Sequence, residues 1–439
     1  MNDRHLLLKG TLLLTLSGFL TKILGFIYRI FLSQVIGAQG MGIYQLIFPI
    51  HTLCFALSVG GIQTAISRFT AARAALKDEQ GARDIFLLST FLSVLIALLS
   101  SFFLYRHASW FAVHILLEES CTPLLKIMAL SIPMGTFHAC VNGYCFARKK
   151  TGRSGCCAAS GTVRSYWHFL SSFSYSDRTR NFPYTRPGCQ RTSGRRTGLH
   201  GVLRIFILLD YKKQQYSLRF MKSPFADIKA IVCLSFPLTC NRLLVNLLHS
   251  IESVLIPGHL RLYGLDNASA LSVYGTLTGM ALPLILFPSA ITNAVSTVLL
   301  PSVAEQQAVG NRNHIRRSIF LSMKYCLLLG AASTAFFYFA GNFLGLLLFK
   351  SEFAGTFIKI LSFICPCLYL SGTLSGILNG LGLVNQSFLL NTLGLGVRLA
   401  FVCLVIPKYG IIGYLWGLIV SELLSTLLSV YFLRDYFHT

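Results

Sequence analysis

The chain has 439 residues, of which 54% are hydrophobic and only 12% are charged, and its formal net charge is +23. A helix that crosses a bilayer needs about 20 mostly apolar residues. No polar stretch of this chain is long enough to form a separate domain with its own core. The composition therefore excludes a soluble enzyme or binding module and predicts an all-α integral membrane protein.

Apolar runs of spanning length follow one another along most of the chain. The first run is too long for a cleaved signal peptide and is interpreted as a span. Ten spans are expected, at Leu12–Gln34, Met41–Ile66, Ile85–Tyr105, Leu124–Phe146, Ile228–Ile256, Leu271–Leu299, Ile319–Leu348, Phe357–Leu378, Leu389–Ile406 and Ile411–Leu433.

Basic residues concentrate in alternate connections between these spans. They are Arg68, Arg73, Lys77 and Arg83, then Arg148, Lys149 and Lys150, then Lys212, Lys213, Arg219 and Lys222, then Arg312, Arg316 and Arg317. Because Lys and Arg are retained on the cytoplasmic side, this alternation predicts a multi-pass protein of the cell membrane with both termini in the cytoplasm. The same placement favours topology signals and contacts with membrane lipid over binding of nucleic acid.

Thirteen cysteines are scattered along the chain, mostly inside the apolar spans. In such places Cys behaves as a small hydrophobic residue. No pair has zinc-ligand spacing with histidines in register. We therefore expect no metal site, and we expect no cofactor.

The two halves of the chain repeat one another. Leu124–Asn142 and Phe357–Asn379 share a Lys, an apolar run, a Pro and a segment of small residues. Gly60–Asp84 and Ser289–Arg317 both leave a span and enter a charged connection. Parallel repeats of this kind build transporters in which the substrate is handled between the halves. The expected architecture is therefore two bundles of six helices, twelve helices in total.

Three segments carry a resemblance to a known family: Ser17–Ile30 (SGFLTKILGFIYRI), Phe236–Leu262 (FPLTCNRLLVNLLHSIESVLIPGHLRL) and Ala270–Thr292 (ALSVYGTLTGMALPLILFPSAIT). They resemble the stage V sporulation protein B branch of the multidrug/oligosaccharidyl-lipid/polysaccharide exporter (MOP) superfamily, which is related to lipid II flippases. The resemblance implies a MATE-like, two-lobed transporter and no enzyme. It also implies that a lipid-linked oligosaccharide or peptidoglycan precursor is flipped across the membrane, in cell-wall or spore-cortex synthesis.

The first half departs from the repeat after its fourth span. Thr151–Val202 contains eight arginines, one acid and two prolines, and it has no apolar run of spanning length. A one-base shift of the reading frame can restore apolar, helix-like sequence there, so we interpret residues 151–203 as frameshifted helices 5 and 6. The alternative is a genuine basic loop in a protein that has lost these helices. The expected division is 1–150 for the N-terminal lobe, 151–203 for the anomalous Arg/Ser-rich segment, 204–224 for a cytoplasmic linker and 225–439 for the C-terminal lobe.

Charged residues inside apolar spans are costly, and they usually face a cavity or a partner. Lys22 and Arg29 lie two helical turns apart in the first span, and Arg242, His249 and Glu252 share one face of a later span. A lipid-linked saccharide carries a pyrophosphate, which guanidinium groups match in bidentate geometry. We predict that these five residues line one substrate-binding cavity, with Arg29 and Arg242 on the phosphates and Lys22 in support. Glu252 would pair with Arg242 in one state or bind a coupling cation.

Each of these residues also has a purely structural interpretation. Lys22 and Arg29 could extend to the lipid headgroups. Arg242 and Glu252 could form an ion pair that only fixes helix packing. In the last two spans, Arg398 and Glu422 are expected to pair with one another.

Two other functions compete with a flippase. A MATE-type drug/cation antiporter would be expected to carry acids in the first lobe, but Met1–Arg148 has no acid inside an expected span. A membrane-embedded enzyme of glycan synthesis would need a carboxylate set or metal ligands, and the sequence has no HExxH motif, paired Asp motif or nucleophile elbow. Basic residues inside the spans favour an anionic, lipid-linked substrate.

Overall fold

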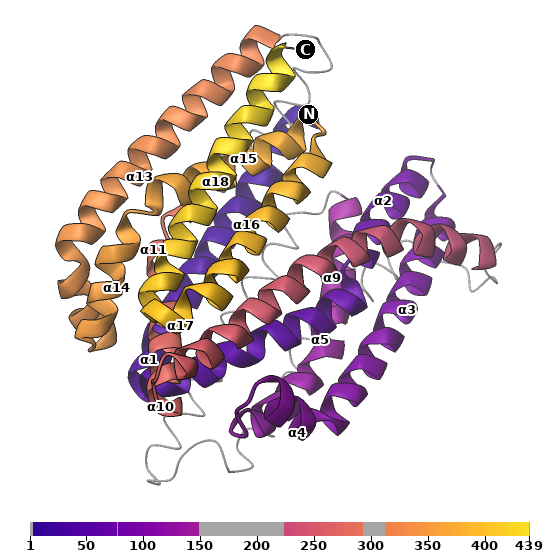
Figure 1. Cartoon of the computed structure of the whole chain (residues 1–439). Coiled ribbons are helices and arrows are strands. Elements are labelled where there is room, and N and C mark those ends of the chain that lie inside the picture. Colours follow the sequence, from indigo (N-terminus) through magenta and orange to yellow (C-terminus); the bar gives the residue numbers. More distant parts are fainter. Residues whose placement is uncertain (1–2, 77, 149–223, 293–311, 439) are drawn as a thin grey trace. The chain divides into compact units, whose positions relative to one another are not determined.

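The computed structural model describes residues 3–76, 78–148, 224–292 and 312–438, and all its regular elements in these ranges are helices (Figure 1). The predicted frameshift segment 151–203, most of the linker 204–224 and the last part of the span expected at Leu271–Leu299 lie outside these ranges. The helices are α1 (Asp3–Val59), α2 (Ile62–Ala75), α3 (Glu79–Arg106), α4 (Ala108–Trp110), η1 (Phe111–Ile115), α5 (Cys121–Ala147), α9 (Pro224–Leu262), α10 (Asn267–Gly275), η3 (Thr276–Ala281), α11 (Leu282–Ile285), α13 (Arg312–Phe349), α14 (Glu352–Ser362), α15 (Cys365–Gly380), α16 (Val384–Leu404), α17 (Ile406–Tyr409) and α18 (Ile411–His438).

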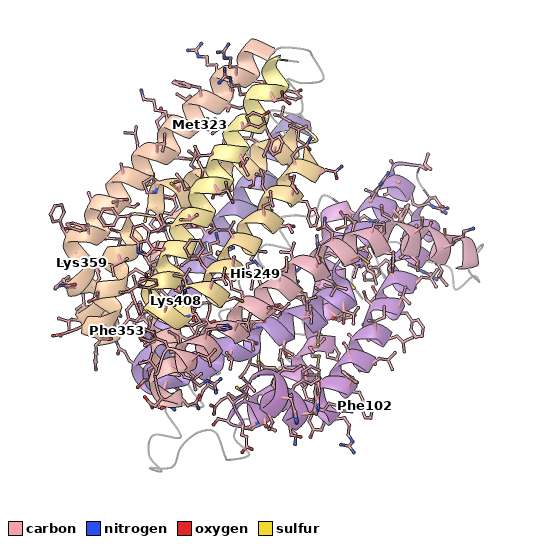
Figure 2. All side chains as sticks on the ribbon, viewed as in Figure 1. Phe102, His249, Met323, Phe353, Lys359 and Lys408 are labelled. Carbon is pink, nitrogen blue, oxygen red and sulfur yellow. The ribbon has the colours of Figure 1, made fainter. Side chains whose placement is uncertain are left out.

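Many of these helices carry apolar side chains on their outer faces. Within the described residues, eight helical segments are long and apolar enough to cross a membrane, or nine when α14 and α15 count as one bent span. Phe102 on α3 is 71% exposed and Phe339 on α13 is 82% exposed, and Figure 2 shows Phe102 on the outside of its helix. Such surfaces suit hydrocarbon, which confirms the prediction of an all-α, multi-pass membrane protein.

The first expected span and most of the second form one helix, α1, with a kink, and the end of the second lies in α2. The expected connection Gly37–Gly42 is helical apart from Gly37, whose φ of 69° and ψ of −175° break the regular geometry. This region of backbone space is open almost exclusively to glycine. Between the two expected spans the chain therefore departs from helical geometry at a single residue.

The chain forms two compact units. The first unit contains Met1–Leu24 and Ile47–Leu247, and the second contains Gly25–Leu46 and Leu248–Thr439. Helices α1 and α9 each contribute residues to both units. The units defined by contacts therefore differ from a division of the chain into two consecutive halves. The lobe boundaries expected from the repeat remain a prediction.

Within the first unit, α3 packs against α1 and α5 through serine side chains. Ser93 donates to the carbonyl of Ser58 over 2.8 Å, and Ser101 donates to the carbonyl of Ala129 over 2.7 Å. Small hydroxyl residues let helices approach closely and satisfy their own polar groups in an apolar medium. Beside them, Ile66, Phe86 and Cys140 belong to a buried apolar cluster.

Ion pairs join the helix ends of the first unit. Arg73 at the end of α2 lies 2.9 Å from Asp78 and 3.1 Å from Asp227 on α9. Arg148, just after α5, pairs with Glu79 at the start of α3. These pairs lie in the basic connections that the alternation of charge assigns to the cytoplasmic side. They show that part of the positive charge holds helix ends together.

In the second unit, α13, α14, α15, α16 and α18 lie side by side (Figure 1). A Cβ atom at Gly345 on α13 would collide with the backbone of Gly355 on α14. Glycine therefore allows these two consecutive helices to pack closely.

The repeated segments Leu124–Asn142 and Phe357–Asn379 have different geometry. The first lies in one continuous helix, α5, which contains Pro133. The second is divided between α14 and α15, which bend by 60° where Pro366 begins α15. Thr334 on α13 donates to the carbonyl of Ser362 over 2.8 Å. This bond satisfies a backbone group at the break, as a bend inside a membrane requires.

Candidate functional site

The five residues predicted to bind substrate lie on two long helices, α1 and α9, and belong to both units. Lys22 and Arg242 are in the first unit, whereas Arg29, His249 and Glu252 are in the second. Lys22, Arg242 and His249 are exposed, Arg29 is half-buried and Glu252 is buried. A common cavity for the five residues stays a prediction.

The three basic residues share one property. Lys22, Arg29 and Arg242 have neither an ion pair nor a hydrogen bond with any other residue that the structure describes. Arginines at the helix ends behave differently, since Arg73 and Arg148 both pair with carboxylates. Charges inside an apolar helix that pair with no described residue are candidates for contact with an external anion.

Glu252 lies at the centre of a buried polar network in the second unit. Tyr414 on α18 donates to its Oε1 atom over 3.0 Å, and Nε of Arg398 on α16 lies 3.6 Å from the same oxygen. Nδ1 of His249, one turn earlier on α9, lies 3.4 Å from Oε2, and Figure 2 labels His249 on that helix. Both carboxylate oxygens are therefore engaged, and the charge is balanced by a guanidinium group.

The predicted pair of Arg398 with Glu422 is wrong. Arg398 pairs with Glu252, and Glu422 accepts a hydrogen bond of 2.8 Å from Ser371. Spacing along one helix could not reveal this arrangement, because the partners come from α9, α16 and α18. The one indication in the sequence was that Tyr414 and Arg398 are isolated polar residues in apolar spans, where each needs a partner.

The network and the basic residues differ in what they can bind. Glu252 has little free capacity for a cation, since its two oxygens already contact three side chains. The guanidinium groups of Arg29 and Arg242, which bond to no described residue, can donate to phosphate oxygens in bidentate geometry. Among the described residues, no group of three His, Cys, Asp or Glu side chains could hold a metal ion.

The chain is similar to several known proteins. Residues 7–149 match the family model described as "Polysaccharide biosynthesis protein". The chain is 27% identical over 431 residues to stage V sporulation protein B of Bacillus subtilis (strain 168), covering 96% of this chain and 82% of that protein. It is also 29% identical over 106 residues to lipid II flippase MurJ of the same organism, covering 24% of this chain and 20% of that protein.

A solved structure has the same fold. It is the inward-facing conformation of a multidrug resistance MATE family transporter of the MOP superfamily, with a TM-score of 0.71. The two chains are 15% identical, and the match covers 95% of this chain and 94% of the other. This membrane protein therefore has the fold of the MATE transporters, and its sequence is similar to stage V sporulation protein B over most of its length.

Proposed function

We propose that this membrane transporter flips a lipid-linked oligosaccharide or peptidoglycan precursor across the cytoplasmic membrane. The observation that carries the proposal is the set of three unpartnered basic residues, Lys22, Arg29 and Arg242, inside apolar helices. In this proposal both termini lie in the cytoplasm, and two lobes rock so that a cavity opens to either side in turn. The names of the relatives, a sporulation protein and a lipid II flippase, support a role in cell-wall or spore-cortex synthesis.

The chemistry of the substrate explains the choice of residues. Its pyrophosphate would accept bidentate hydrogen bonds from Arg29 and Arg242, while Lys22 would act as a point charge. The saccharide would travel through the cavity, and the polyprenyl tail would stay in lipid. The free energy of binding would come from the attraction between the phosphates and these three basic side chains, which pair with no described residue of the protein.

The competing function, drug/cation antiport, would need a carboxylate free to exchange cations. Glu252 is the buried acid on the helix that also carries Arg242, and it is held by His249, Arg398 and Tyr414. The guanidinium group of Arg398 therefore lies beside the carboxylate that a transported cation would have to bind. This favours the anionic substrate.

Complementation of a flippase-deficient or cortex-deficient strain tests the proposal, with a frame-repaired version of the chain at matched protein level. We expect Arg242→Ala to abolish complementation and Arg242→Lys to retain part of it, because the charge survives while the bidentate fork is lost. Arg261→Ala, near the end of the same helix α9, is the matched control and should complement fully. Full activity of a variant that carries both Arg29→Ala and Arg242→Ala would remove the phosphate-binding role.

A further inference from the structure

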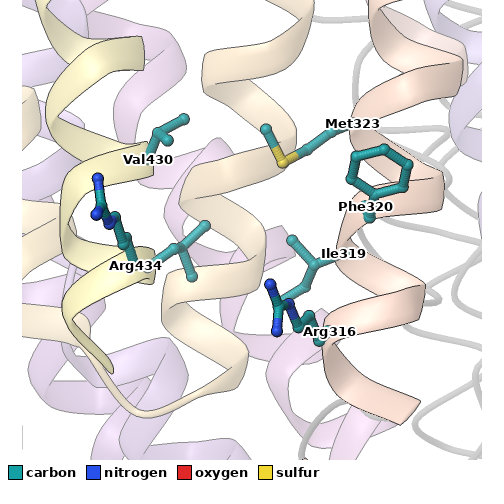
Figure 3. A pocket seen from close by; sticks show the side chains of 7 residues that line it. Arg316, Ile319, Phe320, Met323, Val430 and Arg434 are labelled. Atoms are coloured by element: carbon teal, nitrogen blue, oxygen red, sulfur yellow. The ribbon is translucent and has the colours of Figure 1, made fainter. Parts of the chain in front are cut away.

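A cleft between α13 and α18, in the second unit, has a charged mouth and an apolar wall (Figure 3). Its volume is about 260 Å³. Arg316 from α13 and Arg434 from α18 stand on its two sides, and Ile319, Phe320, Met323 and Leu433 form much of the rest. The start of α13 and the end of α18 therefore meet at this cleft.

The two arginines of the cleft lack partners. Both are exposed, and neither makes an ion pair or a hydrogen bond with another residue in the described ranges. None of the residues that line the cleft is acidic. Two guanidinium groups on the two sides of one cleft, with no carboxylate among its lining residues, suit an anion between them, and their planar forks match phosphate oxygens.

The wall beneath the arginines suits a hydrocarbon chain. Ile319 and Leu433 are buried in the apolar cluster between the helices, whereas Phe320 is 69% exposed on α13. A free phosphate would use the guanidinium groups and leave this apolar surface uncovered. A lipid would use both, since its phosphate and its acyl chain are joined.

The size of the cleft limits what it can hold. Pockets that enclose a drug-sized ligand measure about 300–1,000 Å³, so 260 Å³ accommodates only part of a lipid. The phosphate and the first part of one chain would be enclosed, and the remainder would stay in the bilayer. The basic residues around Arg316 are predicted to lie on the cytoplasmic side, where the leaflet carries anionic lipids.

We propose that the α13–α18 cleft binds one anionic glycerophospholipid of the surrounding membrane. Its phosphate lies between Arg316 and Arg434, and the beginning of an acyl chain lies along Ile319, Phe320 and Met323. This site belongs to the second unit alone. It is independent of what the protein transports.

Thermal unfolding of the purified, delipidated full-length chain in neutral detergent tests the site. Phosphatidylglycerol should raise the apparent Tm in a saturable way, with one lipid bound in native mass spectrometry, and phosphatidylcholine or inorganic phosphate should not. In the double variant Arg316→Gln/Arg434→Gln, the affinity for phosphatidylglycerol should fall about five-fold for each arginine removed.

The matched control is Arg317→Gln/Lys324→Gln, which removes the same charge from exposed positions on α13 outside the cleft. It should leave the affinity unchanged. An equal loss of affinity in both double variants would mean that only the general surface charge attracts the lipid. An equal Tm shift with phosphatidylcholine would overturn the assignment of an anionic headgroup. A response to inorganic phosphate as strong as to phosphatidylglycerol would make the site one for free anions.

A second measurement does not depend on the folding of the double variant. A photoreactive phenylalanine analogue at Phe320, in an otherwise unchanged chain, should crosslink to phosphatidylglycerol in vesicles. Excess phosphatidylglycerol should suppress the product, and excess phosphatidylcholine should not. Absence of the product would refute lipid in the cleft.

Discussion

Individual charged residues in the apolar helices fall into two classes. Glu252 and Arg398 compensate each other inside the second unit. Lys22, Arg29 and Arg242 have no described partner. We expect the first class to stabilise the protein, and we propose that the second binds the substrate. Both classes are visible in the sequence as charges in spans, but only the folded structure separates them.

Breaking the Glu252–Arg398 pair should destabilise the protein. Glu252→Gln or Arg398→Gln leaves one buried charge without its counterpart, and we expect a loss of about 2–3 kcal/mol for each. This is at the low end for buried pairs because the Arg398 side chain is 20% exposed. The measurement is the apparent Tm of the purified variants in detergent.

The double variant Glu252→Gln/Arg398→Gln provides the control for that prediction. It removes both charges, so it should be less destabilised than the sum of the two single variants. Strict additivity of the three values would show that the two side chains do not interact. Glu422→Gln, which changes an acid bonded to Ser371 that interacts with Arg398 less than Glu252 does, should depend on Arg398 more weakly than Glu252→Gln.

At the scale of helices, two departures from straight geometry shape the protein. One is the kink at Gly37 in α1, and the other is the 60° bend between α14 and α15. Both occur at residues that the sequence marks, a glycine and a proline. Their backbone consequences differ, because glycine permits a positive φ whereas proline removes a hydrogen-bond donor.

Substitution of Gly37 should reveal the cost of the kink. No neighbouring atom lies within 4 Å of a Cβ added at Gly37 or at Gly258 on α9, but only Gly37 has a positive φ. Gly37→Ala should therefore lose about 1–3 kcal/mol through backbone strain, whereas Gly258→Ala should be neutral or gain up to about 1 kcal/mol. Apparent Tm values of the two variants provide the comparison, and equal shifts would show that α1 straightens without cost.

The bend should depend on Thr334. Thr334→Val keeps the side-chain shape but leaves the carbonyl of Ser362 without its donor, at a cost of about 1–3 kcal/mol. Thr356→Val is the control, since Thr356 is exposed and bonds only within its own helix, at 3.3 Å to the carbonyl of Glu352. Thermal unfolding should separate the two variants. Equal apparent Tm values for the two variants would mean that another donor bonds to the carbonyl of Ser362 at the bend.

The sequence predicted the helices better than it predicted their joints and pairs. Hydrophobic runs identified the spans because burial in lipid acts on each helix by itself. The first two expected spans are joined by a kink and not by a separate connection, because one glycine, Gly37, was sufficient to redirect α1. The pair of Arg398 with Glu252 was missed, since helical periodicity describes one helix at a time and these residues lie on different ones. The predicted cavity depends on the placement of two units and remains a prediction.

At the scale of the whole molecule, the repeat predicts two more helices than the ten expected spans supply. The match to residues 7–149 ends where the anomalous segment 151–203 begins. We expect the chain with its present sequence to complement a flippase-deficient strain poorly, and a version with the reading frame shifted over that segment to complement well. Protein levels in the membrane must be equal in the two strains. Robust complementation by the present sequence would show that the segment is a functional part of the protein.

The second unit is built from two segments that lie far apart in the sequence, and this affects when it can assemble during synthesis. Gln45 bonds to the carbonyl of Thr278, 233 residues later, and Gln34 bonds to that of Leu348, 314 residues later. At about 5–20 residues per second, these partners leave the ribosome roughly 10 to 60 s after the first stretch has entered the membrane. Until then the side-chain amides of Gln34 and Gln45 lack these partners, so assembly of this unit waits at least until α13 has been translated.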